Sequence, residues 1–205
     1  TRGREILDMV GITPCFGVIF PSSDRVLFLL QEHAQTFSRW HFRPFEVVFD
    51  TTRHSFNRRT LFTQCKNQHR LCFVMVTDRD DVFGVYLPTP RFQIQKGKTQ
   101  IVDARQFLFC LKSSKVATPR RWFPKAGTDE QAVLMVQNGE VGTSSDVVVW
   151  FGTQSQYLTV RTQGHRLLFK HFESLYDGID DGTLLGQSGS GKKFTLLCNR
   201  LIVFI

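Results

Sequence analysis

The stretch from residue 71 to residue 86 constrains the fold more than any other part of the chain. Residues 71–76 are apolar without interruption, residues 78–81 are polar turn formers, and residues 82–86 are again mostly apolar. This pattern predicts a β-hairpin, and a strand that is apolar on both faces must be covered on both faces, which places it centrally in a sheet. A buried helix segment is the alternative, but the four valines of the stretch favour strands. Gly84 indicates a bulge or a close approach by another backbone.

The rest of the chain predicts many strands and few helices. Ser23 is a suitable N-cap for a helix over residues 23–37, and Ser55 for a second helix over residues 55–65. We expect a loop with a short strand over residues 91–104, a basic turn over residues 119–124 and a glycine-rich loop over residues 178–191. Further strands are expected over residues 45–49, 106–111, 132–136, 147–151, 157–160, 167–172 and 194–205.

These elements predict a mainly β (α+β) fold, a two-sheet antiparallel β-sandwich with a few flanking helices. We expect residues 1–205 to form a single domain, in which residues 1–26 are a weakly determined N-terminal extension. The sequence contains no internal repeat and no clear linker. The chain begins at Thr1 rather than Met, which leaves a preceding segment open.

Composition agrees with one well-filled core in a reducing compartment. The chain is 41% hydrophobic and contains 20 phenylalanines, whose large rings suit the interior of a sandwich. The five cysteines are widely spaced and lie mostly in apolar runs, unlike the close pairs of a disulfide framework or a zinc site. No apolar run reaches the roughly 18 residues of a membrane span, and no signal-peptide pattern is visible. We therefore expect an intracellular protein, in the cytoplasm and also in the nucleus.

Positive charge is concentrated in one part of the sequence. The net charge is +8, and residues 91–125 contain nine lysines and arginines against one acidic residue, Asp103. Such an excess favours acidic partners such as nucleic acid, anionic lipid or an acidic protein surface. Arginines beside Trp122 suit phosphates and stacked bases, but charges that only solvate loops, or a turn anchored by Trp122, produce the same pattern. The candidate binding patch consists of Arg91, Lys96, Lys98, Arg120, Arg121 and Lys125.

Motifs for nucleotide or metal binding are incomplete. Residues 186–193 are similar to a phosphate-binding loop, but Lys193 stands where a Ser or Thr would bind magnesium, and too little chain follows for a nucleotide fold. His165 and His171 are expected on one face of a strand-like run, too far apart to share a metal easily. We expect no catalytic residues, no metal and no cofactor.

Cys65 is the candidate reactive thiol. Lys66 follows it directly, and His69 and Arg70 are near in the sequence, so positive neighbours would lower the thiol pKa. The alternative is a small core residue on a helix.

Several segments together resemble the TLDc domain of oxidation-resistance proteins. They are residues 45–50 with Arg53-His54-Ser55, the helix to Cys65, the strand Asp81-Val82-Phe83-Gly84-Val85-Tyr86, Phe107-Leu108-Phe109-Cys110-Leu111, Trp150-Phe151-Gly152 and the closing apolar strand. The resemblance covers residues 27–205. It implies a sandwich of two antiparallel sheets with flanking helices and no established active site.

The resemblance also implies a function. Members of the family act in protection from oxidative stress, and several bind the vacuolar proton pump and influence its assembly. We therefore expect a noncatalytic interaction domain whose partner is a protein, with proton-pump subunits as the implied partner. The alternative is a basic domain that binds nucleic acid in stress-linked transcriptional control, and a third hypothesis is a peroxide-reactive thiol protein that uses Cys65. The sequence leaves the contact residues and the oligomeric state open.

Overall fold

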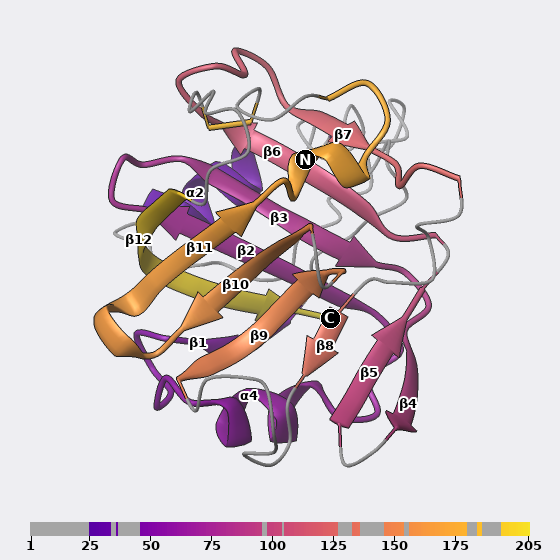
Figure 1. The fold of residues 1–205 in the computed structure, drawn as a ribbon. Coiled ribbons are helices and arrows are strands. Elements are labelled where there is room, and N and C mark those ends of the chain that lie inside the picture. The colour runs from indigo at the N-terminus through magenta and orange to yellow at the C-terminus, as the bar shows by residue number, and fades with distance from the viewer. Residues whose placement is uncertain are drawn as a thin grey trace, which may run out of the picture.

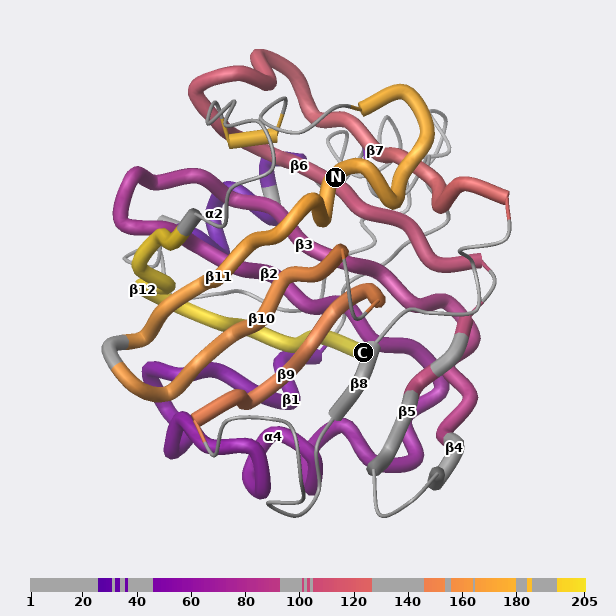
Figure 2. The backbone as a smooth tube through the Cα atoms, viewed as in Figure 1, coloured from indigo at the N-terminus to yellow at the C-terminus, as the bar shows by residue number. Residues whose placement is uncertain are grey.

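The computed structural model of the chain describes residues 25–33, 36, 46–95, 98–103, 105–126, 133–135, 146–153, 156–179, 184–185 and 194–205 (Figure 2). The helices are α2 (Arg25–Glu32), α4 (Arg58–Cys65) and the short 3-10 helices η1 (Gln163–His165) and η2 (Glu173–Leu175). The strands are β1 (Val47–Asp50), β2 (Leu71–Thr77), β3 (Val82–Leu87), β4 (Arg91–Gln95), β5 (Lys98–Val102), β6 (Phe107–Lys112), β7 (Arg120–Trp122), β8 (Val133–Met135), β9 (Val147–Gly152), β10 (Tyr157–Arg161), β11 (Arg166–Lys170) and β12 (Phe194–Phe204).

The described strands follow one antiparallel path in the order β4-β5-β8-β9-β10-β11-β12-β2-β3-β6-β7, and β1 also pairs with β12. The path divides at β12 into two layers, with β8 to β11 in front of β2 and β3 in Figure 1. We call β1, β2, β3, β6 and β7 sheet A, and β4, β5, β8, β9, β10 and β11 sheet B. The predicted mainly β sandwich is therefore confirmed.

Strand β12 connects the two sheets. Its first half pairs with β11, where Phe194 lies opposite Phe169, and its second half pairs with β2, where Phe204 lies opposite Cys72. The register with β2 shifts between Cys198 and Arg200, which marks a bulge at the transition. Strands that pass from one sheet to the other commonly do so at a bulge, because the extra residue lets the strand bend.

Aromatic rings fill the space between the sheets. Phe73 of β2 packs edge-on against Phe151 of β9 with ring centroids 5.3 Å apart, and Phe83 of β3 lies 5.9 Å from Phe169 of β11. All four side chains are buried. Helix α4 adds Leu61 and Cys65 to this same core. These phenylalanine rings therefore fill the interior of the sandwich, as the sequence predicted.

Strand β2 is covered on both faces, as its sequence predicts. Phe73 and its same-face neighbours belong to the core between the sheets, whereas Cys72, Val74 and Val76 belong to a second core on the outer face of sheet A. Leu27 and Leu30 of α2 complete this second core. The amphipathic spacing of α2 therefore serves to cover the central hairpin.

Gly84 marks a close approach and not a bulge. A Cβ atom at this position would lie 2.0 Å from the Phe73 carbonyl oxygen and 2.5 Å from Cζ of Phe109. The pairing of β2 with β3 runs without a shift through Gly84, which lies opposite Val74. The missing side chain makes room for the Phe109 ring on the outer face of sheet A.

The predicted loop with one short strand proves to be a two-stranded hairpin, the predicted basic turn contains a strand, and one helix begins later than predicted. Residues 91–102 form the hairpin β4–β5, and residues 120–122 of the predicted basic turn pair with β6 as β7. The polar and basic residues of these strands concealed a weak apolar alternation in the sequence, as at Phe92 and Ile94. Helix α4 is capped by Asn57, whose Oδ1 accepts a hydrogen bond from the Thr60 N–H at 2.9 Å, and not by Ser55.

No helix among the described residues is long and apolar enough to cross a membrane. The predicted N-terminal extension up to residue 24, the loop similar to a phosphate-binding loop at 186–193 and most of the predicted glycine-rich loop lie outside the described residues.

Candidate functional site

The predicted basic patch is divided between the two ends of the strand path. Arg91 begins β4, whereas Arg120 and Arg121 lie on β7, the last strand at the other end. These two strands are well separated in Figure 1. Lys96 and the side chain of Lys98 lie outside the described residues. The structure therefore brings together only the residues at β7, and Arg91 is not part of that group.

A cationic and aromatic cluster forms at β7. The guanidinium carbon of Arg121 lies 5.1 Å from the ring centroid of Phe123 and 5.5 Å from that of Phe107. Phe123 is 48% exposed, and Arg120 and Lys125 are also exposed. We call Arg120, Arg121, Phe123 and Lys125 the β7 basic surface. Cation–π contacts hold Arg121 in place while one aromatic ring stays open to solvent, an arrangement that suits a flat anionic ligand.

Cys65 lies in the core and not in an electropositive surface site. Its side chain is completely buried at the end of α4, and burial raises its pKa well above the ordinary value. The expectation that Lys66 and His69 would lower this pKa is contradicted, because desolvation of a thiolate dominates in an apolar surrounding. Burial also raises the pKa of Cys110 and of Cys198 to about 12. These three thiols therefore serve as packed side chains of the core.

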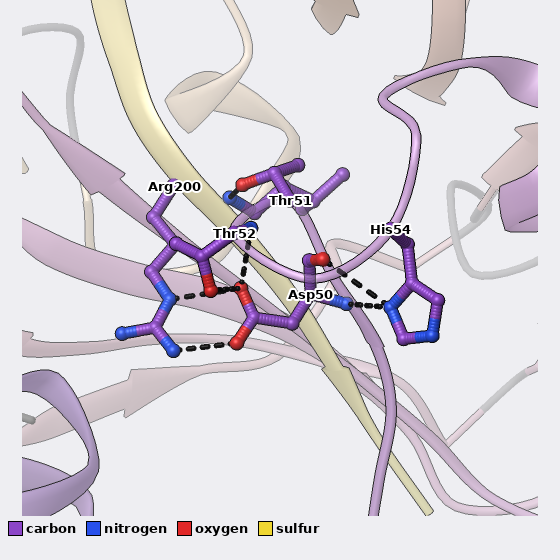
Figure 3. A network of polar contacts seen from close by, with 6 residues as sticks. Asp50, Thr51, Thr52, His54 and Arg200 are labelled. Carbon is purple, nitrogen blue, oxygen red and sulfur yellow. Dashed lines mark hydrogen bonds and ion pairs between the residues drawn. The ribbon is translucent and has the colours of Figure 1, made fainter.

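The most extensive polar network of the described residues centres on Asp50, at the end of β1 (Figure 3). The Arg200 side chain reaches it from β12 with two bonds, Nε to Oδ1 at 3.0 Å and Nη2 to Oδ2 at 2.5 Å. The N–H and the hydroxyl of Thr52 both donate to Oδ1 at 2.9 Å. The Asp50 backbone N–H donates to Nδ1 of His54 at 3.0 Å. The Asp50 side chain is 1% exposed and that of Arg200 is 11% exposed.

These contacts determine the charge state of Asp50. Burial by itself raises the pKa of a carboxylic acid, but the hydrogen bonds from Arg200 and Thr52 together with the guanidinium charge outweigh it, so the pKa of Asp50 is lowered. The carboxylate is therefore held ionised with its oxygen atoms occupied by donors. Such a group is a poor general base, and it serves to fix the end of β1 to β12.

Sequence reasoning missed this network, although a signal was present. Arg200 is the only charged residue of the closing strand, residues 194–204, and a charge within an apolar strand requires a partner. Asp50 and Arg200 are 150 positions apart. No sequence spacing identifies such a pair, and only the pairing of β1 with β12 brings the two together.

The segment Trp150-Phe151-Gly152 forms the last three residues of β9. Gly152 has a φ of +100°, and a Cβ atom there would lie 2.4 Å from the Gln156 carbonyl oxygen. The indole N–H of Trp150 donates to the Thr153 carbonyl at 3.2 Å. Glycine is needed at this position both for its backbone conformation and for space.

The two histidines considered for metal binding belong to different local structures. His165 ends η1, and its ring packs edge-on against Phe56 at 5.1 Å between centroids. His171 follows β11 in a left-handed conformation with a φ of 47°. The expectation that both lie on one face of a strand is therefore wrong. The described residues contain no cluster of three or more His, Cys, Asp or Glu side chains suited to a metal ion.

Comparison with known proteins identifies the family. No curated protein matches the chain. The sequence model of the TLDc domain matches residues 23–183, which include every described element except β12. This match covers most of the 205 residues. The chain therefore belongs to the TLDc domain family.

Proposed function

We propose that the protein is a noncatalytic interaction domain that acts in protection from oxidative stress by binding subunits of the vacuolar proton pump. Membership of the TLDc family is the observation that carries this proposal. The described chemistry agrees with it, because the Asp50 carboxylate is occupied by Arg200 and Thr52 and the Cys65 thiol is buried. Function then resides in surfaces that contact a partner.

The test uses the purified chain as bait in a lysate of its own organism, with and without nuclease. Retained proteins are identified by mass spectrometry. The proposal predicts recovery of proton-pump subunits in both conditions. Absence of pump subunits, in either condition, contradicts it.

Binding of single-stranded nucleic acid is the second candidate function, favoured by the β7 basic surface. Arg121 lies over the ring of Phe123, and the exposed part of that side chain offers a contact for a base, while the positive charges of Arg120 and Lys125 attract phosphates. Stacking on an aromatic side chain contributes about 1–3 kcal/mol per base.

A labelled single-stranded oligonucleotide tests this candidate in a titration repeated at several salt concentrations. Nucleic-acid binding predicts an affinity that falls steeply with salt and weakens about tenfold in Phe123→Ala. Phe28→Ala is the matched control, because Phe28 is another exposed phenylalanine, 58% exposed on α2, that is not part of the β7 basic surface. An affinity that is independent of salt excludes the candidate.

A further inference from the structure

Three threonines of the chain are followed by proline, and Thr118 differs from the other two. An arginine, Arg121, stands three positions after Thr118, whereas Thr13 and Thr89 have a phenylalanine at that position. Proline-directed protein kinases accept a Thr-Pro pair because proline has no N–H that an apolar pocket of the enzyme would leave without a partner. Some of these kinases also select a basic residue three positions on, which pairs with an anionic group of the enzyme. The sequence at Thr118 meets both requirements.

The loop between β6 and β7 presents Thr118 to solvent. The Ser113 hydroxyl accepts hydrogen bonds from the N–H of Lys115 at 3.2 Å and from that of Val116 at 3.0 Å, which fixes a turn. Val116 is 6% exposed and anchors the loop in the core, and the next two residues, Ala117 and Thr118, are exposed. Figure 1 shows this loop at the top of the view. The base of the loop is therefore held in place while the threonine is open to solvent.

The hydroxyl of Thr118 is available, whereas that of Thr89 is occupied. Thr118 makes no hydrogen bond with any residue that the structure describes. The Thr89 hydroxyl donates to Oδ1 of Asp103 at 3.1 Å and accepts from Nε of Arg105 at 3.3 Å, and the Thr89 N–H donates to Oδ2 of Asp103. A kinase must break these contacts before the Thr89 hydroxyl can react. The two described Thr-Pro-Arg segments thus differ in the availability of their acceptor.

The residues that follow Thr118 lie in extended backbone at the edge of the described sheet. Proline fixes its own φ and favours extended backbone in the residue before it, and Arg120–Trp122 form β7. Strand β7 is the last strand at its end of the path. Arg121 is partly exposed, and its guanidinium lies over the exposed Phe123, so its charge is at the surface. Protein kinases bind the residues after the acceptor as an extended segment, which this edge provides.

From these observations we infer that Thr118 is a phosphorylation site for a proline-directed protein kinase that selects a basic residue three positions after the acceptor. Oγ1 of Thr118 attacks the γ-phosphorus of ATP, the bond from that phosphorus to the β,γ-bridging oxygen breaks, and ADP leaves. The hydroxyl proton passes to the catalytic base of the kinase. This inference goes beyond the proposed interaction function and does not depend on it.

Phosphorylation also changes the charge beside the β7 basic surface. A phosphate on Thr118 carries a charge of about −1.5 to −2 and stands two residues before Arg120. It therefore offsets the charge of about two cations there and repels the phosphates of a nucleic acid. This consequence rests on the second candidate function, the binding of single-stranded nucleic acid.

The experiment treats the purified chain with a cyclin-dependent kinase and MgATP and locates the phosphate by peptide mapping with mass spectrometry. We compare the wild type with Thr118→Ala, Arg121→Gln and Arg120→Gln. Arg120→Gln is the matched control, because it removes the same charge one residue earlier, at a position that these kinases do not select. Circular dichroism shows that each variant is folded. The comparison of Thr118 with Thr89 is made within the wild-type chain and needs no variant.

The inference predicts phosphate on Thr118 and none on Thr89, and no phosphate at position 118 of Thr118→Ala. Arg121→Gln should be phosphorylated about tenfold more slowly, because a charged contact with the kinase is lost, and Arg120→Gln should keep the wild-type rate. Phosphate on Thr89 in place of Thr118, no phosphate on the folded chain, or equal rates in the two arginine variants overturns it.

A titration of the phosphorylated chain with the labelled oligonucleotide separates the site from its consequence. The phosphorylated chain should bind at least about tenfold more weakly than the unmodified chain at low salt. Equal affinity of the two forms contradicts the predicted effect on the β7 basic surface. If the unmodified chain binds no oligonucleotide, the second candidate function fails, and the peptide map still decides whether Thr118 is the phosphorylation site.

Discussion

At the scale of single residues, Asp50 makes the polar contact with the greatest expected effect on stability. Asp50→Asn keeps the shape of the side chain but leaves the guanidinium of Arg200, 11% exposed, without its counter-charge. Removing one partner of a buried ion pair should lower the free energy of unfolding by about 3 kcal/mol. Urea denaturation measures this change. Asp177→Asn, at an exposed position, is the control and should change it by less than about 0.5 kcal/mol.

The lowered pKa of Asp50 also predicts how the free energy of unfolding depends on pH. Because the pKa of Asp50 is lower in the folded chain than in the unfolded chain, the folded state binds fewer protons at this site. Its stabilising contribution is complete above the unfolded pKa of about 3.9 and is lost as the pH falls through the folded pKa. The difference in unfolding free energy between wild type and Asp50→Asn should therefore shrink as the pH is lowered below about 4. Denaturation curves at a series of pH values measure it, and a difference independent of pH would contradict this account of the pair.

Gly84 tests the close packing of the central hairpin. In Gly84→Ala the added methyl group would meet the Phe73 carbonyl oxygen at 2.0 Å, so backbone must move, and we expect a loss of at least about 3 kcal/mol. Gly178→Ala is the matched control, because its φ of +72° is unfavourable for alanine but no atom lies within 4 Å of the new methyl group. That variant should lose about 1 kcal/mol. Thermal and urea unfolding measure both, and equal losses would refute the packing argument.

At the scale of elements, the reactivity of the buried cysteines measures how readily α4 and the two sheets open. Cys65 lies on α4, Cys72 on β2, Cys110 on β6 and Cys198 on β12, and all four are buried. In a Cys15→Ser variant we expect these thiols to react with a disulfide reagent only as fast as the elements open, and immediately in denaturant. Rapid reaction of native Cys65 at neutral pH, identified by mass spectrometry, would instead support the peroxide-reactive thiol hypothesis.

The elements differ in how well they could be predicted from the sequence. The β2–β3 hairpin was predictable, because its strands are covered on both faces and their apolar runs are unbroken. Only one short strand was expected over residues 91–104, where β4 and β5 form a hairpin, and β7 was expected to be a turn, because the charged residues of these three strands obscured the apolar pattern. The helix start at Asn57 depended on which of two suitable polar residues, Ser55 or Asn57, accepts the capping hydrogen bond from a backbone N–H of the first turn.

Candidate sites were less predictable than strands, for a physical reason. The cluster of Arg121 with Phe123 could be recognised because the two are close in sequence. The network of Asp50 and Arg200 depends on the pairing of β1 with β12, which lie in separate parts of the chain. Local sequence cannot reveal a contact that only long-range strand pairing assembles.

At the scale of the whole molecule, the two outer faces of the sandwich differ. Helix α2 covers the outer face of sheet A, whereas α4 lies beside β1 and β9 (Figure 1). The described thiols are buried, and Asp50, centre of the most extensive described polar network, is occupied by structural contacts. The arrangement supports a domain that works by presenting a surface.

Cosedimentation of the purified chain with purified vacuolar proton pump tests the central claim most directly. The account predicts saturable binding that nuclease does not change and that requires the folded chain. Absence of cosedimentation at chain concentrations up to about 0.1 mM, where even weak association is detected, would contradict it.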